Sequence, residues 1–464
     1  MFNVKKLIFV VSPLLLFIYF FNFFIQKDSI LVENNVKNLS IGSSTRNLIV
    51  LLSLESVRWD HLSFIKYERS TTPFFEKLLN ESLVFENVFT AIPITAPSHA
   101  SMFSALRRSL GEELINTGDL GKEITLLAEY LREEGYKTGA FTGSDVLRNP
   151  GFEQGFDVYE KVQFTESNGS GSVYMQKNRR SIDTIALALG WLDTLSSNDK
   201  IFIWIHLADP HYKLLSDGPF YINSKSDSIK SDIDLKDYLE SKEKVYVADK
   251  PIISYHEDRI SFDQLSVSLK NLNKYDGAIQ EIDKQSEKLY KYFENKGMLE
   301  DSLWFILADH GEGLGSHNYR GHSNRIYQEQ IRTPLIMHSP SMTEGYRLPY
   351  LAENVDILPT IAEIVGFELT DEYEIDGESL LKYIREGKGK DYVFSMTPTN
   401  KAYSIQNEKY KYIYHDKEII EWGEVVNKDM FFDLENDPYE QNNIIGTMPK
   451  IENEMKELIL ERAI

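Results

Sequence analysis

Three short apolar runs in the sequence are each followed at once by side chains that can bind a metal ion. The runs and the residues after them are 47–54 with Glu55, 201–207 with Asp209, Pro210 and His211, and 303–308 with Asp309 and His310. Such runs are typical of buried parallel strands, and ligands of open α/β sheets bind beyond the carboxyl ends of those strands. A helix cap explains one strand-end carboxylate, but several at one edge favour a site. Mixed carboxylate and imidazole ligands suit Zn²⁺ or Mn²⁺, so the sequence predicts a metal centre there.

A fourth segment, Thr95-Ala96-Pro97-Ser98-His99, supplies a hydroxyl group that could act as a nucleophile. Pro97 stands where a helix can begin, which places Thr95 among free backbone N–H groups that favour an anion. A dication bound there would lower the pKa of the Thr95 hydroxyl and make it an alkoxide. Taken alone, this segment favours the simpler interpretation that Thr95 only caps the helix.

Apolar and amphipathic segments alternate along the chain that must position these residues. The predicted strands are 47–54, 83–89, 137–141, 201–207, 303–308 and 334–338, and the predicted helices are 73–80, 125–134, 180–195, 273–295 and 355–365. This alternation predicts an α/β fold in which helices sandwich a large, mostly parallel sheet. Short strands at 392–395, 402–406 and 410–414 and a helix at 451–462 predict a small C-terminal α+β subdomain.

The same patterns divide the chain into four parts. They are an N-terminal transmembrane anchor at 1–27, a polar linker at 28–46, a catalytic domain at 47–385 and the C-terminal subdomain at 386–464. A polar, weakly periodic stretch at 213–263 predicts an insertion in the catalytic domain, which is either a lid over the site or a surface decoration.

Residues 7–25 form an almost unbroken apolar run that follows Lys5 and Lys6. As a helix this run would be about 28 Å long, close to the thickness of a bilayer core. A cleaved signal peptide is the alternative, but Phe23 and Phe24 stand where its cleavage site needs small residues. The positive-inside rule therefore predicts a single-pass cell-membrane protein with a cytoplasmic N-terminus and an extracytoplasmic catalytic domain.

The composition narrows the classes of partner. The 464 residues include 50 Lys and Arg against 71 Asp and Glu, which gives a net charge of −21. A chain without a basic excess is not expected to bind nucleic acid. There are no cysteines, which excludes disulfides, thiolate metal sites and a cysteine nucleophile. An anionic substrate would need a local positive centre to overcome the net charge, and a bound dication would supply one.

The ordered set of motifs resembles the sulfatase family of the alkaline phosphatase superfamily. Residues 54–61 are similar to the first metal-binding segment of that family, and residues 95–101 match its nucleophile segment. Further matches in the family's order are 135–138, 155–157, 209–211, 275–277, 309–312, 355–360, 376–377 and 433–438. The resemblance covers about 47 to 443. It implies an alkaline phosphatase-like fold and an enzyme that cleaves phosphate or sulfate esters through a covalent intermediate.

The resemblance also implies a role for each candidate residue. Glu55, Thr95, Asp309 and His310 would hold a divalent ion, with Thr95 also the nucleophile. His211 and His322 would bind the transferred group, assist the leaving oxygen or hold a second ion. The residues expected to orient these groups or to contact substrate are Arg58, His99, Glu312 and His317. The cofactor is one or two divalent ions, Zn²⁺ or Mn²⁺, with Ca²⁺ or Mg²⁺ as alternatives. His206 lies inside a predicted strand, and it is equally well explained as a site residue or as a buried histidine whose hydrogen bonds are satisfied.

Two departures from the family pattern leave the substrate open. Sulfatases carry a cysteine or serine that becomes formylglycine, whereas this chain has Thr95, so no formylglycine is expected. His99 replaces the family's arginine. A threonine nucleophile resembles phosphoethanolamine and phosphoglycerol transferases, so a transferase that modifies envelope lipids or glycans is the alternative function. The expected partner is an anionic ester, on a glycan or a lipid headgroup. A catalytically dead binding protein is the third alternative, but it predicts a lost ligand and all four remain.

Overall fold

The computed structural model describes most of the chain downstream of residue 45. The described residues are 46–107, 119–162, 178–211, 246–247, 250–251, 262–319, 321–370, 372–397, 402–416, 420–421, 424–425 and 429–462. The predicted anchor and linker, and nearly all of the predicted insertion at 213–263, lie outside the described residues.

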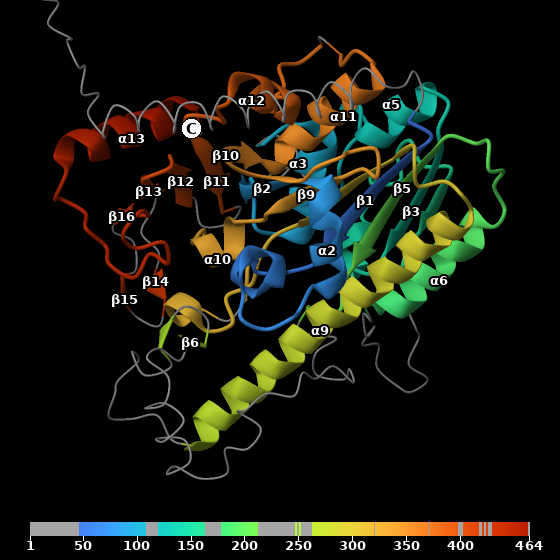
Figure 1. Cartoon of the computed structure of the whole chain (residues 1–464). Coiled ribbons are helices and arrows are strands. Elements are labelled where there is room, and N and C mark those ends of the chain that lie inside the picture. The colour runs from blue at the N-terminus through green and yellow to red at the C-terminus, as the bar shows by residue number, and fades with distance from the viewer. Residues whose placement is uncertain are drawn as a thin grey trace, which may run out of the picture.

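An eight-stranded sheet runs through the centre of the molecule in the order β10-β2-β9-β8-β1-β5-β3-β4 (Figure 1). Its strands are β1 (Leu48–Leu54), β2 (Ser82–Phe89), β3 (Lys137–Thr142), β4 (Val158–Glu160), β5 (Ile201–Leu207), β8 (Ser302–Ala308), β9 (Leu335–His338) and β10 (Tyr346–Glu353). Strand β9 is antiparallel to both of its neighbours, and the other pairings in this sheet are parallel. The prediction of a large, mostly parallel sheet is confirmed.

Helices cover both faces of this sheet (Figure 1). One face packs against α3 (Thr95–Ser104), α5 (Leu127–Glu133), α11 (Ile357–Val365) and α12 (Leu380–Glu386). The other face packs against α2 (Pro73–Leu78), α6 (Ser181–Leu192) and α9 (Phe262–Asn295). The central strands are mostly apolar because successive side chains point to opposite faces and both faces are buried; Ser53 in β1 and His206 in β5 are exceptions. In β1, Ile49 and Leu51 join the first core, whereas Leu48, Val50 and Leu52 join the second.

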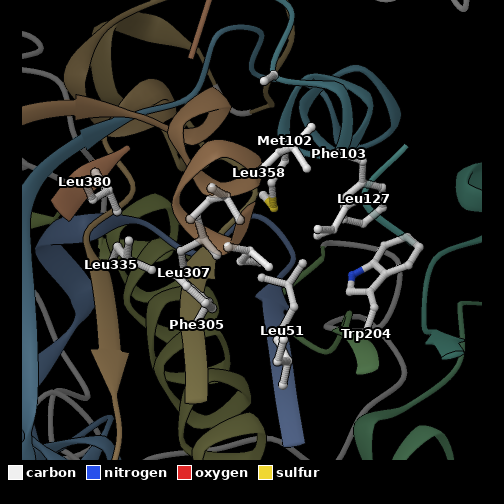
Figure 2. Packing of buried hydrophobic residues seen from close by; sticks show 14 of the residues in the cluster. Leu51, Met102, Phe103, Leu127, Trp204, Phe305, Leu307, Leu335, Leu358 and Leu380 are labelled. Carbon is white, nitrogen blue, oxygen red and sulfur yellow. The ribbon is translucent and has the colours of Figure 1, made fainter. Parts of the chain in front are cut away.

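Figure 2 shows the first core from close by. Leu51, Phe305 and Leu307 rise from neighbouring strands toward Met102 and Leu358 of the covering helices. These side chains are almost fully buried, so α3 is fixed on the sheet by apolar contacts along its length. The position of Thr95, the first residue of α3, is therefore set by the core.

A separate four-stranded antiparallel sheet follows toward the C-terminus, in the order β11-β12-β13-β16. Its elements are β11 (Val393–Met396), β12 (Ala402–Gln406), β13 (Tyr410–His415), β16 (Met430–Asp433) and the covering helix α13 (Pro449–Arg462). Ser395 Oγ donates to the carbonyl of Thr90 (2.7 Å), and the Met396 N–H donates to the carbonyl of Ala91 (2.8 Å). The predicted small α+β unit is present, and the boundary at 385 stays a prediction.

The remaining elements are short. They are α10 (Gln328–Ile331), the strand pairs β6 (Tyr246–Val247) with β7 (Lys250–Pro251) and β14 (Ile420–Glu421) with β15 (Glu424–Val425), and 3₁₀ turns at Trp59–His61, Ser63–Ile65, Leu79–Glu81, Asp145–Arg148, Ser316–Asn318 and Asn354–Asp356. The sequence interpretation missed β10, an edge strand whose apolar pattern is broken by Arg347 and Pro349 and whose register shifts between Leu348 and Leu351. Edge strands tolerate proline and bulges, which hides them from pattern reading.

The prediction of a single-pass cell-membrane protein is overturned. Among the described residues, no helix is both long enough and apolar enough to cross a membrane. The longest helix, α9, has 34 residues, but charged side chains such as Lys284, Glu287 and Lys291 recur along it. The run 7–25, on which the prediction depended, lies outside the described residues.

Truncation of one core side chain tests this packing. Phe305→Ala removes a fully buried ring from β8 and should lower the free energy of unfolding by about 3–5 kcal/mol, because it loses apolar burial and leaves a cavity. Urea unfolding followed by tryptophan fluorescence measures the change. The control Leu187→Ala, at a side chain 39% exposed on α6, should change stability by about 0.5 kcal/mol or less. Equal effects of the two substitutions would contradict the assignment of Phe305 to the core.

Candidate active site

The carboxyl ends of β5, β1 and β8 bring the candidate metal ligands together. The Glu55 N–H donates to the carbonyl of Leu207 (2.9 Å), and the Asp309 N–H donates to the carbonyl of Leu54 (3.2 Å). The sheet pairing thus continues one residue past the strands, which places Glu55 beside Asp309. Both side chains are buried.

Ser56 turns the chain sharply after Glu55. Its φ is +57°, in the left-handed region that non-glycine residues seldom adopt. In this conformation its N–H donates to Asp309 Oδ1 (3.0 Å), and its carbonyl accepts from the Tyr275 hydroxyl (2.6 Å). The His310 N–H also donates to Asp309 Oδ1 (2.8 Å), so that oxygen is fully occupied.

Thr95 lies directly against this pair of strand ends. Its hydroxyl donates to Glu55 Oε1 (2.6 Å), and its Oγ1 is 3.2 Å from His310 Nε2. The start of α3 is tied to β8 because Ser98 Oγ donates to the carbonyl of Asp309 (2.7 Å). Of the sequence candidates, Glu55, Thr95, Asp309 and His310 therefore form one buried cluster.

The hydrogen bonds of His310 fix which ring nitrogen faces Thr95. Nδ1 lies 2.8 Å from the carbonyl of Gly311 and must donate to it, so the bare lone pair of the neutral ring is on Nε2. Burial lowers the pKa of His310 and outweighs the opposing charge of Asp309, which keeps the ring neutral. A neutral imidazole with its second nitrogen anchored on a carbonyl is typical of metal ligands.

Two carboxylate oxygens of the cluster make no hydrogen bond with the described residues. They are Glu55 Oε2 and Asp309 Oδ2. Burial, together with the charge of Asp309, raises the pKa of Glu55. Orphaned buried oxygens are rare, and a cation between them would satisfy both and offset the repulsion. Glu55, Asp309 and His310 each offer a ligand atom within 4.8 Å of the others, so the residues fit the divalent ion that the sequence predicted.

His322 and His211 lie at the edge of this cluster. The His322 ring is 4.4 Å from the ring of His310 and 5.8 Å from that of His211. His322 Nδ1 is 3.2 Å from Glu312 Oε2. Burial lowers the pKa of His322, but the hydrogen bond and charge of Glu312 and the charges of Glu55 and Asp309 raise it above the ordinary value. His322 is thus suited to donate a proton near Thr95.

Three further candidates, Arg58, His99 and Glu312, form hydrogen bonds that fix the position of segments next to the site. Arg58 forms two hydrogen bonds with Asp60 and donates to Ser316 Oγ (2.9 Å) and to the carbonyl of Gly313 (3.1 Å), which fixes the loop after β8. His99 Nδ1 donates to the carbonyl of Thr95 (2.7 Å), in the first turn of α3. Glu312, by its bond to His322, orients that ring.

The structure places His317 in a second cluster, away from Thr95. Its ring stacks on Tyr327 at 3.7 Å, with Nδ1 2.9 Å from Glu329 Oε1 and Nε2 3.0 Å from the carbonyl of Glu440. Both nitrogens therefore face acceptors. Glu440 is also paired with the buried Lys411 (2.6 Å), so this cluster joins the loop after β8 to the C-terminal sheet.

The sequence left the role of His206 open. It is fully buried in β5 and lies 3.3 Å from Glu55 Oε2 and 3.6 Å from Asp309 Oδ2. The feature of the sequence that marks His206 is that it is a single imidazole in an otherwise apolar strand.

Asp209, by contrast, has a structural role. It accepts from the Ser181 N–H (2.7 Å) at the start of α6 and so caps that helix. His61 pairs with Asp276 (2.7 Å), and His338 contacts Ser82, so both are structural.

Comparisons with known proteins show the family of the chain. A family model described as Sulfatase matches residues 47–367, and one described as N-sulphoglucosamine sulphohydrolase, C-terminal, matches residues 315–463. The multifunctional alkaline phosphatase superfamily protein PehA of Trinickia caryophylli is 23% identical, over 87% of this chain and 92% of its own length. The choline-sulfatase of Rhizobium meliloti is 23% identical, over 80% and 77%.

Solved structures share the fold. BT4656, solved with its substrate D-glucosamine-2-N,6-O-disulfate, has a TM-score of 0.66 at 18% identity and covers 90% of this chain and 97% of its own. The phosphonate monoester hydrolase SpPMH from Silicibacter pomeroyi has a TM-score of 0.65 at 16% identity, with coverage of 89% and 94%. These likenesses confirm the fold. The chain belongs to the sulfatase family, and the predictions of family, fold and hydrolase class are confirmed.

The His317 cluster predicts a pH dependence of stability. Burial lowers the pKa of His317, but Glu329 and Glu440 raise it above 6.5. The folded state thus binds this proton more tightly than the unfolded state. The stabilisation is complete below pH 6.5 and is lost as the pH rises through the folded pKa. In urea unfolding at pH 6, His317→Gln should lose about 3 kcal/mol, and the loss should shrink at pH 9.

The matched control for this experiment is His338→Gln. Burial lowers the pKa of His338 to about 4, so this ring is neutral in the folded state at both pH values. The difference between wild type and His338→Gln should not shrink from pH 6 to pH 9. A pH-independent loss for His317→Gln would show that its charge adds nothing to stability.

Proposed function

We propose that this protein is a metal-dependent hydrolase of phosphate or sulfate esters that forms a covalent ester on Thr95. The observation that carries the proposal is the position of the Thr95 hydroxyl, 2.6 Å from Glu55 Oε1 and 3.2 Å from His310 Nε2. A hydroxyl between a carboxylate and a neutral imidazole can lose its proton and act as a nucleophile. Membership of the sulfatase family supports the same class of reaction.

Glu55, Asp309, His310 and Thr95 would hold the divalent ion. When bound, this ion lowers the pKa of the threonine hydroxyl and neutralises charge that develops on the transferred group. The buried and unpaired oxygens of Glu55 and Asp309 support this assignment.

The chain's own residues account for the bonds that change. Thr95 Oγ1 bonds to phosphorus or sulfur as the bond to the leaving oxygen breaks, and the threonine proton passes to Glu55 Oε1. His322, protonated through Glu312, gives its proton to the leaving oxygen. Water then attacks the same phosphorus or sulfur and returns a proton to His322. Thr95 Oγ1 leaves, recovers its proton from Glu55, and inorganic phosphate or sulfate is released.

The proposed substrate is an anionic ester on a glycan. BT4656 was solved with a disulfated glucosamine, and an N-acetylglucosamine-6-O-sulfatase of Bacteroides thetaiotaomicron is 21% identical over 84% of this chain. Phosphate esters are proposed as substrates beside sulfate esters, because Thr95 cannot become the formylglycine that sulfatases use. The comparisons reported above give no support to the transferase alternative.

Substitution of the nucleophile tests this proposal. Thr95→Ala should lower kcat for the preferred nitrophenyl ester by about 10⁴-fold or more, because no oxygen remains to form the ester. Thr95→Ser keeps a hydroxyl and should retain far more activity. The assay compares nitrophenyl phosphate, a phosphodiester analogue and nitrophenyl sulfate, and mass spectrometry of acid-quenched protein locates the modified residue. Turnover that survives Thr95→Ala would refute the nucleophile assignment.

Removal of the cation gives an independent test. Treatment of the full chain with a chelator should abolish turnover, and Mn²⁺ or Zn²⁺ should restore it in the wild type. The matched control is Thr95→Ala, which keeps both carboxylates and His310 and should bind the ion without recovering turnover. Full activity in a protein shown by elemental analysis to hold no divalent ion would exclude the proposed metal dependence.

A further inference from the structure

Two buried histidines flank the proposed metal site on the side of β5 and α3. His206 and His99 are both fully buried, and each could offer a ligand atom to a cation together with Asp309. Their rings lie 4.9 Å apart, nearly perpendicular. Their hydrogen bonds, however, are entirely different, and the difference separates their roles.

Both nitrogens of His99 are occupied. Nδ1 donates to the carbonyl of Thr95 (2.7 Å), so Nε2 of the neutral ring accepts from Ser53 Oγ (2.8 Å). Ser53 Oγ in turn accepts from Trp204 Nε1 (2.9 Å). No lone pair of His99 is left for a metal.

Neither nitrogen of His206 makes a hydrogen bond with the described residues. Its Nε2 nevertheless faces the two orphaned carboxylate oxygens, Glu55 Oε2 at 3.3 Å and Asp309 Oδ2 at 3.6 Å. The backbone of β5 and the neighbouring ring of His99 set its orientation. Three polar atoms without hydrogen bonds among the described residues therefore face one another. They are Glu55 Oε2, Asp309 Oδ2 and His206 Nε2.

The separations between these atoms match ligands that share one cation. N–H···O hydrogen bonds measure about 2.7–3.2 Å, which is shorter than the separations found here. Nitrogen and oxygen ligands about 2.0–2.2 Å from Zn²⁺ in a tetrahedron lie about 3.3–3.6 Å apart. The two distances from His206 fall in that range, as does the 3.6 Å between His310 Nε2 and Asp309 Oδ2.

From this geometry we infer that His206 is a further ligand of the divalent ion, through Nε2. The inference rests on the proposed metal-dependent function. Two imidazoles and two carboxylates then make up the tetrahedral set, and the Thr95 oxygen would be a fifth donor, a number to which catalytic zinc sites can expand. Such a donor set favours Zn²⁺ or Mn²⁺ over Ca²⁺ or Mg²⁺, which prefer oxygen ligands alone. His206 thus restricts the choice of ion that the sequence left open.

The competing explanation is an ion pair, in which a protonated His206 balances the two carboxylates. The two explanations predict opposite effects of removing the ring. Loss of a ligand weakens cation binding, whereas loss of a nearby positive charge strengthens it. The sign of the change in affinity therefore decides between them.

The experiment measures the dissociation constants of Zn²⁺ and Mn²⁺ for the full chain by competition with a chromogenic chelator. His206→Ala should weaken both by about 100-fold or more, beyond the effect of losing a residue that only orients a ligand. The matched control, His338→Gln, alters another buried histidine, remote from the site, and should leave both constants unchanged. Unchanged or tighter binding in His206→Ala would overturn the inference.

A measurement on the wild type keeps the inference testable if His206→Ala does not fold. Electron spin-echo modulation of the Mn²⁺-loaded protein counts the coordinated imidazole nitrogens. Two imidazoles are expected, from His310 and His206. A single imidazole would reject His206 as a ligand and leave the proposed function standing. Absence of any bound ion would instead refute the proposed metal site itself.

Discussion

The repulsion between two buried carboxylates is the constraint on which the rest of the site depends. Glu55 and Asp309 are held side by side by the sheet pairing of β1, β5 and β8, and one oxygen of each lacks a hydrogen bond. Burial of such a pair is costly unless opposite charge is brought in. Hydrogen bonds reduce this cost only in part. Asp309 Oδ1 accepts from the N–H groups of Ser56 and His310, Glu55 accepts from the Thr95 hydroxyl, and the neighbouring His310 ring is neutral. The remaining repulsion is the physical reason for the divalent ion proposed above.

The sequence predicted the central strands well for a simple physical reason. β1, β5 and β8 are buried on both faces, so each is a largely apolar run that is closely followed by a reactive residue. The start of α3 was also readable, because Pro97 marks it. The edge strand β10 and the C-terminal strand β16 were missed, since strands with a partly exposed face carry mixed patterns.

The side-chain roles were less accessible from sequence. A motif identifies which residues come near each other, but not which ring nitrogen is free. His99 and His206 illustrate this limit, because both are histidines near Asp309. Only the hydrogen bonds of His99 to Thr95 and Ser53 show that its nitrogens are occupied, whereas those of His206 are not. His317, close to Asp309 along the chain, turns away because its own φ is +47° and its ring stacks on Tyr327.

The bond between His317 and Glu440 has a consequence for how the protein is made. It joins residues 123 positions apart, and Glu440 also accepts from the Gln328 N–H (2.6 Å) through its side chain. Contacts of such long sequence separation form late, and the ribosome delivers the chain from its N-terminus. The loop after β8 therefore has its full set of contacts only once Glu440 has been synthesised and has reached it. The candidate site, although built from residues before 323, therefore depends on a contact that the C-terminal sheet supplies.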